Sequence, residues 1–259
     1  MQIIKSLFQD YFIWSFMGMS EIKKRYRRSI LGPFWLVLSN VAVVFSLSAI
    51  YSIILKKDFN WYVIYLGIGF VIWQFISSSL SESTEYFIKS SNLIKTYRIS
   101  VYNYVFKETG KNFIFLIHNL PFWLLIIFFF NVDISLNVIV IIFSYLLIFL
   151  NAIWVSSILA LISTRYRDLS PIVSTLVQLS FFATPVLWDI SHIIEIRPDV
   201  AWIIYINPFY HILEIFRGPI MNGVIPYQSF MVCLALAIFG NIFSSFIFNK
   251  YSRKIVLWL

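Results

Sequence analysis

The chain has 259 residues, of which 60% are hydrophobic and 12% are charged, and its formal net charge at pH 7 is +8. A water-soluble domain carries about twice that charged fraction, so the composition excludes an ordinary soluble domain. Six stretches lack any charged side chain, and each is long enough for the roughly 20 helical residues that cross a bilayer. They lie at 29–55, 59–81, 112–132, 134–164, 169–188 and 218–249. Because they do not alternate as barrel strands do, they predict an all-α polytopic membrane protein, with residues 1–259 as one domain.

The first predicted element, within residues 1–30, is an amphipathic helix that ends in a basic cluster. Its apolar residues recur on one helical face, as in a helix that lies in the membrane surface, with a solvated tail as the alternative. These residues are Ile4, Leu7, Phe8, Tyr11 and Phe12. The cluster KKRYRR then places five cations in the six positions 23–28, where they meet anionic lipid head groups. Gly32 and Pro33 end this element and begin the first span.

Six membrane spans are predicted, with both termini in the cytoplasm. Their bounds are 33–55, 60–81, 112–131, 135–163, 170–188 and 229–249. With the amino terminus placed inside, 16 of the 20 lysines and arginines fall in the inner segments. This orientation follows because lysine and arginine accumulate on the cytoplasmic side of membrane proteins.

Two segments between spans are too long for simple turns. The inner loop, residues 82–111, mixes charges with apolar residues at helical spacing. This pattern predicts an amphipathic cytoplasmic helix that covers the protein's own underside or docks a partner. The outer segment, residues 189–228, holds a short apolar run at 200–213 that is broken at Asn207-Pro208. That run is too short to cross the bilayer and fits a re-entrant or interfacial helical hairpin.

Catalytic and nucleotide-binding patterns are missing from the sequence. It has no GxxxxGK[ST] phosphate loop, no Asp-x-Asp pair and no histidines at metal-ligand spacing. Ion-coupled transporters carry ionisable groups in mid-membrane, whereas every charged side chain here falls in a loop or at a predicted span boundary. We therefore expect no catalytic residue, no metal site and no cofactor in this chain. Any transport then takes its energy from another subunit.

Three motifs resemble the permease subunits of polysaccharide-exporting ABC transporters, a family that includes O-antigen, capsule and teichoic-acid exporters. KKRYRRSILGPFWLVLSN, residues 23–40, is similar to the run that leads into their first span. STRYRDLSPIVSTLVQLSFFATPVLW, residues 163–188, is similar to the connection between their fourth and fifth spans. INPFYHILEIFRGPIMNG, residues 206–223, is similar to the external segment before their last span. The motifs keep the family's order over nearly the whole chain.

The resemblance implies a homodimer of six-span permeases in a bacterial cytoplasmic (inner) membrane, in contact with membrane lipids. It implies two copies of a separate ATPase subunit, which binds ATP and Mg. It also implies an amino-terminal interface helix, a coupling helix after the second span, and short external gate helices after the fifth. The implied cargo is a polysaccharide on a polyprenyl diphosphate, with O-antigen first among the family's polymers, and not a nucleic acid.

Two other functions are weighed against this one. An ABC permease that exports drugs or lipids has the same topology and the same kind of partner. An integral-membrane transferase that uses polyprenyl-linked sugars needs clustered acidic residues at a membrane face, and the sequence shows none.

The basic cluster and two helix faces are the candidates for contact with the cargo. Arg25, Arg27 and Arg28 lie where a diphosphate arrives, and arginine pairs well with phosphate oxygens; membrane orientation and lipid contact explain the same cluster. A sugar channel is expected on helix faces with small and polar groups, although such stripes equally suit close helix packing. The candidates are Ser39, Ala42, Ser46 and Ala49 in the first span, and Ser170, Ser174, Gln178 and Phe181 in the fifth.

Three further sets of residues are given roles in coupling and gating. Contact with the ATPase is predicted for the loop helix, through Leu93, Ile94, Tyr97 and Arg98. At the inner mouth, ion pairing with the interface helix is predicted for Arg165, Arg167 and Asp168. In the external hairpin, closure of a resting pore is predicted for Trp202, Ile203 and Ile206, with a passive interfacial skirt as the alternative.

Overall fold

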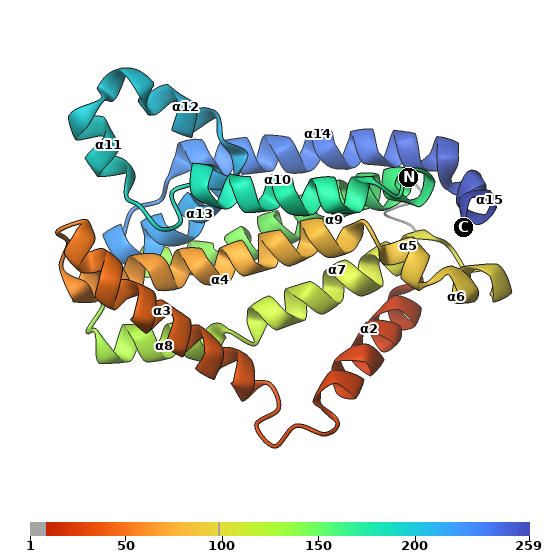
Figure 1. Cartoon of the computed structure of the whole chain (residues 1–259), viewed down its shortest axis with the longest axis horizontal. Coiled ribbons are helices and arrows are strands. Elements are labelled where there is room, and N and C mark those ends of the chain that lie inside the picture. Colours follow the sequence, from red (N-terminus) through yellow and green to blue (C-terminus); the bar gives the residue numbers. More distant parts are fainter. Residues whose placement is uncertain (1–8, 98) are drawn as a thin grey trace.

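The computed structural model describes residues 9–97 and 99–259, and every regular element in these residues is a helix. Ile4, Leu7 and Phe8 of the predicted leader helix, and Arg98 of the inner loop, lie outside the described residues. In chain order the α-helices are α2 (Tyr11–Tyr26), α3 (Phe34–Ile54), α4 (Phe59–Ser83), α5 (Tyr86–Lys89), α6 (Ser91–Thr96), α7 (Tyr102–Ile117), α8 (Leu120–Phe129), α9 (Ile141–Arg165), α10 (Leu169–Ala183), α11 (Ile190–Ile196), α12 (Ala201–Ile206), α13 (Pro208–Arg217), α14 (Tyr227–Tyr251) and α15 (Ile255–Trp258) (Figure 1).

Five helical stretches in the described residues are long and apolar enough to cross a membrane, which confirms an all-helical, multi-pass fold. They are Phe34–Ile54, Phe59–Ser83, Tyr102–Phe129, Leu136–Arg165 and Tyr227–Trp258. The remaining predicted span, 170–188, contains α10, an apolar helix of only 15 residues. The count of six spans and the cytoplasmic placement of both termini therefore stay predictions.

α10 ends at Ala183 because the next residues are Thr184 and Pro185. Thr184 has an extended backbone, with φ −98° and ψ 141°, as expected for a residue that precedes proline. The chain is then non-helical as far as α11, and its carbonyl oxygens need donors that lipid cannot supply. The hydroxyl of Tyr65 on α4 donates to the carbonyls of Pro185, at 2.9 Å, and of Trp188, at 2.8 Å.

The helix that leads into the third predicted span begins at Tyr102, ahead of the predicted span bound of 112. The predicted inner loop, 82–111, therefore shortens to α5, α6 and the residues up to 101. Lys107, Glu108 and Lys111 lie inside α7, in the turns that precede the predicted span, and not in an irregular loop. They are tolerated there because they are paired with one another and with acidic side chains of α2 and α4.

α4 is the central helix of the fold. It packs against α3, α7, α9, α10 and α13, and its residues Leu66 and Ile72 are fully buried. A second apolar cluster joins α5, α6, α7, α9, α14 and α15. Figure 1 shows α5, α6 and α15 at one end of the molecule and α11 and α12 at the other. The predicted orientation makes the first of these ends cytoplasmic.

Candidate functional site

The two helix faces predicted as channel lining lie on α3 and α10, which both pack against α4. On α3, Ala42, Ser46 and Ala49 are exposed and Ser39 is half-buried. On α10, Ser174 and Gln178 are exposed. The exposed members of these stripes are not covered by any other described part of the chain, which leaves them open to a channel or to a second copy.

Two other residues of the predicted α10 stripe, Ser170 and Phe181, attach α10 to α4 and to Thr84, the residue that follows α4. The hydroxyl of Thr84 lies 3.0 Å from that of Ser170, to which it donates a hydrogen bond. The ring of Phe181 packs on Trp73 of α4, with ring centroids 5.6 Å apart. Ser170 and Phe181 therefore hold α10 in place, and the exposed part of the stripe is Ser174 and Gln178.

A cavity of about 490 Å³ lies between the carboxyl-terminal end of α2, α4 and the α7–α8 junction. Arg25 of the basic cluster lines this cavity, and its guanidinium carbon lies 4.6 Å from the centroid of the Phe115 ring, a cation–π geometry. Arg27 and Arg28 are exposed beyond the end of α2 and are not among the lining residues. The structure therefore separates Arg25 from the other two arginines of the predicted head-group set.

A chain of side-chain amides runs beside this cavity, and its two ends, Gln74 and Asn119, line it. Gln74 donates to the Asn40 side-chain oxygen at 2.8 Å, and Asn40 donates in turn to the Asn119 side-chain oxygen at 2.5 Å. Asn119 then donates to the backbone carbonyl of Phe115 at 2.9 Å. The chain fixes α3, α4 and the α7–α8 junction to one another. Asn40 and Gln74 were visible in the sequence as polar groups within spans, but nothing in it predicted their partners.

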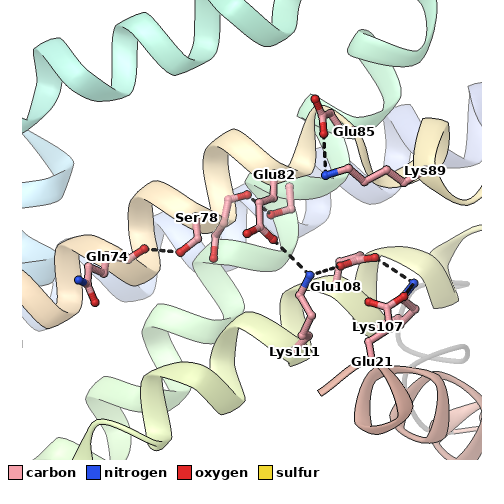
Figure 2. Close-up of polar contacts among 11 residues, drawn as sticks. Glu21, Gln74, Ser78, Glu82, Glu85, Lys89, Lys107, Glu108 and Lys111 are labelled. Carbon is pink, nitrogen blue, oxygen red and sulfur yellow. Dashed lines mark hydrogen bonds and ion pairs between the residues drawn. The ribbon is translucent and has the colours of Figure 1, made fainter. Parts of the chain in front are cut away.

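Next to the cavity, five charged side chains form a continuous series of ion pairs that sequence reasoning missed (Figure 2). It runs from Glu21 on α2 through Lys107, Glu108 and Lys111 on α7 to Glu82 on α4. The Lys107–Glu108, Lys111–Glu108 and Lys111–Glu82 contacts measure 2.9, 2.6 and 3.3 Å. Because the Lys107 and Glu108 side chains are only 5% and 7% exposed, losing one partner leaves an uncompensated buried charge.

The ion pairs predicted at the inner mouth are not seen among the described residues, and they stay a prediction. Arg165 lies over the rings of Tyr166 and Trp258, at 5.3 and 5.5 Å, and none of the ion pairs among the described residues includes Arg165, Arg167 or Asp168. The interface helix α2 is instead paired to α7, through Glu21 and Lys107. The RYRD motif suggested charge complementarity, but Tyr166 ends α9 and Arg165 stacks on aromatic rings near the chain's end.

The predicted coupling residues divide between surface and core. Leu93 on α6 and Tyr97, which follows it, are 40% and 55% exposed. Ile94 is only 6% exposed and belongs to the second apolar cluster, so its side chain is not on the contact surface. Arg98 lies outside the described residues. Of the four predicted coupling residues, Leu93 and Tyr97 are the ones that the structure shows at the surface.

At the opposite end, α12 and α13 meet at Asn207-Pro208, where the sequence predicted a break. The Asn207 side chain caps α13 by accepting from the backbone of Phe209 at 2.9 Å, and it donates to Thr184 at the same distance. The predicted gate residues all lie on α12 and are strongly exposed: Trp202 by 59%, Ile203 by 56% and Ile206 by 69%. α12 thus presents an apolar face that the chain itself leaves uncovered.

Arg217, at the end of α13, fixes this external segment to the spans. It is 4% exposed and donates to the carbonyls of Pro185 at 2.5 Å, Val186 at 3.2 Å and Tyr65 at 3.2 Å. Its guanidinium carbon also lies 3.6 Å from the centroid of the Tyr65 ring. The side chain runs past Gly69 of α4, where an added Cβ atom meets it at 2.1 Å. Arginine reaches this position because α4 has no side chain at that point.

Comparison with known proteins identifies the family of this membrane fold. The profile of a family described as ABC-2 type transporter matches residues 14–221. The chain belongs to this family. It is 25% identical over 238 residues to an O-antigen export system permease protein RfbA of Klebsiella pneumoniae, with 90% of each chain covered. A Myxococcus xanthus protein of the same name is 21% identical over 234 residues, again with 90% of each chain covered.

The predicted resemblance is thereby confirmed at the level of the family. As an ABC-2 permease the protein is a multi-pass membrane transport subunit, consistent with a bacterial inner membrane. Membership in this family implies an ATPase partner and contact with membrane lipids.

Proposed function

We propose that this ABC-2 permease is the channel-forming half of an ATP-driven exporter, which moves a polyprenyl-diphosphate-linked polysaccharide across the cytoplasmic membrane. O-antigen is the first candidate cargo. The observation that carries the proposal is that relatives named O-antigen export permeases match 90% of this chain and 90% of their own length. A match over nearly the full length of both chains favours the same kind of cargo more strongly than a match over one short segment would.

A homodimer is proposed because one chain offers only half of a channel. The exposed stripes on α3 and α10 face away from the chain's own core, and a second copy encloses a space between such faces. The lining then consists of Ser39, Ala42, Ser46 and Ala49 with Ser174 and Gln178. Their small and polar side chains leave room for a hydrated glycan and offer it few strong contacts, so it can slide.

ATP and Mg are proposed to act in two copies of a partner subunit, beneath the cytoplasmic end. Leu93 and Tyr97 are the exposed contacts for that partner. α5 and α6 share an apolar cluster with α7, and α7 carries the ion pairs to α2 and α4. Movement of the partner therefore reaches the cavity wall through packed helices. At the external end, the exposed apolar face of α12 is proposed to close the resting channel.

Stimulation of ATP hydrolysis by different cargoes tests this function. The chain is purified with its ATPase partner in lipid nanodiscs, and hydrolysis is measured with a lipid-linked polysaccharide, with small amphiphilic drugs and with phospholipid alone. We expect the glycan lipid to stimulate hydrolysis and the other two to have no effect. Stimulation by drugs or phospholipid but not by the glycan lipid contradicts the proposal and favours a drug or lipid exporter.

A further inference from the structure

α14 carries an apolar stripe that no other described part of the chain covers. Its members lie three and four positions apart, on one side of the helix, and are between 57% and 72% exposed: Phe239, Ile242, Phe243 and Phe246. A groove of about 820 Å³ runs along this stripe, with Trp154 of α9 as its other wall, and every residue that lines it is apolar. Figure 1 shows α14 along one edge of the molecule. Because α14 is a predicted span, the groove opens to the hydrocarbon of the bilayer.

The Trp154 wall of this groove is fixed to both helices. Its ring fits against α14 because Gly240 has no side chain; a Cβ atom added there lies 2.4 Å from the ring. The indole N–H donates to the side-chain oxygen of Asn151 at 3.0 Å, and Asn151 donates to the backbone carbonyl of Cys233 on α14 at 3.0 Å. The groove is therefore built into the packing of α9 against α14.

A smaller cavity of about 270 Å³ shares two lining residues with the groove, Trp154 and Leu236. It reaches inward between α4, α9 and α13, where its lining includes Phe75, Ile148 and Ile212. Space of this kind is unusual in a close-packed protein interior, and a cavity lined mostly by apolar side chains does not hold water well. The groove and the cavity together suit a flexible hydrocarbon chain.

The end of the stripe nearest α15 carries exposed cations. Lys250 follows Phe246 by four positions, on the same side of α14, and Arg253 and Lys254 follow the end of that helix. None of the ion pairs among the described residues includes any of the three. The sequence contains no aspartate or glutamate after Glu214, so no carboxylate of α14 or α15 competes for them. The stripe therefore ends in positive charge that is available to an anion.

The length of the groove matches one leaflet of a membrane. From Leu236 to Phe246 the helix rises about 15 Å, which is half of the roughly 30 Å hydrocarbon core. Lys250 lies about 6 Å further along, at the depth of lipid head groups. On α9, the exposed Arg165 comes 11 positions after Trp154, close to three whole turns and so on the same side of that helix. Both walls of the groove thus carry a cation at head-group depth.

We propose that this groove binds one anionic phospholipid of the cytoplasmic leaflet as a resident ligand. Its phosphate lies against Lys250 and Arg253, one acyl chain follows the stripe, and the end of that chain enters the cavity beside α13. Basic sites between spans on the cytoplasmic side suit anionic head groups. The groove lies on α9 and α14, and not on the α3 and α10 stripes proposed to line the channel. The inference therefore goes beyond the proposed function and holds whatever the cargo is.

Lipid binding to the complex with its ATPase partner tests the charged half of the site. The complex is delipidated in detergent, and dissociation constants of phosphatidylglycerol and phosphatidylethanolamine are measured by native mass spectrometry. We expect one phosphatidylglycerol per chain, bound about tenfold more tightly than phosphatidylethanolamine, because only the first has a net negative head group. Lys250→Gln combined with Arg253→Gln is expected to remove this preference. Lys23→Gln combined with Lys24→Gln is the matched control: it removes two exposed cations of α2, far from the groove in sequence, and is expected to keep the preference.

Ala235→Trp tests the apolar half of the site. Ala235 is exposed and lines the groove, so a larger side chain fills the space without entering the core. We expect both phospholipids to bind about tenfold more weakly, because the acyl chain loses apolar contact. Ile238→Trp is the matched control: Ile238 is 50% exposed on the same helix and does not line the groove. Its lipid binding is expected to equal that of the wild type.

Four results overturn the inference. The first is wild-type affinity for phosphatidylglycerol in the double charge variant or in Ala235→Trp, and the second is equal binding of the two phospholipids. The third is displacement of phosphatidylglycerol by an equimolar short prenyl diphosphate, which makes the groove a cargo site. The fourth is a covalent dimer through Phe239→Cys in native membranes, which places a second copy on this face. None of the four measures export, so each leaves the proposed function standing.

Discussion

Arg217 shows how one residue decides the geometry of the external end. Among the described residues no carboxylate pairs with it; it is held by three backbone carbonyls and by the ring of Tyr65. The sequence placed this cation in the outer segment, residues 189–228. Its burial depends on Gly69, which is far away along the chain. A spacing pattern predicts neither that contact nor its consequence.

Replacement of Arg217 by methionine is expected to destabilise the protein. The variant removes the donor to the Val186 carbonyl and leaves the Pro185 carbonyl with Tyr65 as its donor, at a cost of about 3 kcal/mol. Arg217→Lys recovers only part of the loss, because an ammonium lacks the planar fork. Chemical denaturation in detergent measures both effects. Arg197→Met is the control: Arg197 is exposed and paired only with the exposed Asp199. An equal loss in both methionine variants contradicts the assigned role.

Asp189 gives the external end a dependence on acid. Burial disfavours its charge, but hydrogen bonds from Ser191 and Lys57 outweigh this effect and hold the pKa of the carboxyl below its ordinary value of 3.8. The stabilisation is therefore complete above about pH 4 and is lost as the pH falls through the lowered pKa. We expect Asp189→Asn to lower the thermal midpoint at pH 7, with the difference shrinking as the pH falls below the ordinary pKa of 3.8. A difference that is constant over this range argues against the ion pair.

At the scale of elements, charge-free runs predicted five spans well because hydrophobic length is a simple requirement of the bilayer. The observed helix bounds depart from the predicted span bounds at two places, for physical reasons. α7, which leads into the third predicted span, is helical from Tyr102 because its charges neutralise one another inside the protein, which a count of charges along the chain does not reveal. α10 is short because the pair Thr184-Pro185 ends a helix inside an apolar run.

The interface helix α2 is expected to loosen when its ion pair to α7 is removed. Glu21→Gln leaves Lys107 with Glu108 as its only acidic partner, so α2 keeps its apolar contacts but loses the charge contact. Hydrogen–deuterium exchange of residues 11–26 is expected to rise about tenfold, which corresponds to roughly 1.4 kcal/mol of lost local stability. The matched control is Glu85→Gln, which breaks the exposed ion pair with Lys89. An exposed pair of this kind adds little to stability. Unchanged exchange in α2 after Glu21→Gln contradicts a supporting role for this pair.

At the scale of the whole molecule, the cavity and the ion-pair series could not be read from the sequence. Asn40 and Asn119 lie 79 positions apart, and only the packing of α3 against the α7–α8 junction brings them together. By contrast, the class of protein and the family followed from composition and from three motifs, because these are properties of the chain itself. Exposed faces on α3, α10 and α12 are where the proposed second copy and the proposed gate are expected to act.

Cross-linking tests whether a second copy covers the α3 stripe. Ser46 is exposed on α3, whereas the native Cys233 is buried. In the variant Ser46→Cys, a flexible bis-maleimide therefore reacts with the new thiol. We expect a covalent dimer in native membranes from Ser46→Cys. Phe239→Cys is the control, because Phe239 is 72% exposed on α14, away from the predicted stripes. A dimer formed by Phe239→Cys and not by Ser46→Cys places the second copy elsewhere.

Transport in proteoliposomes tests the central claim most directly, namely that a separate ATPase drives movement of a glycan lipid through this chain. Labelled lipid-linked polysaccharide is placed in the ATPase-facing leaflet, and its arrival on the opposite side is measured by enzymatic accessibility. The account predicts arrival only when the chain, its partner, ATP and Mg are all present. Arrival with the chain alone contradicts it.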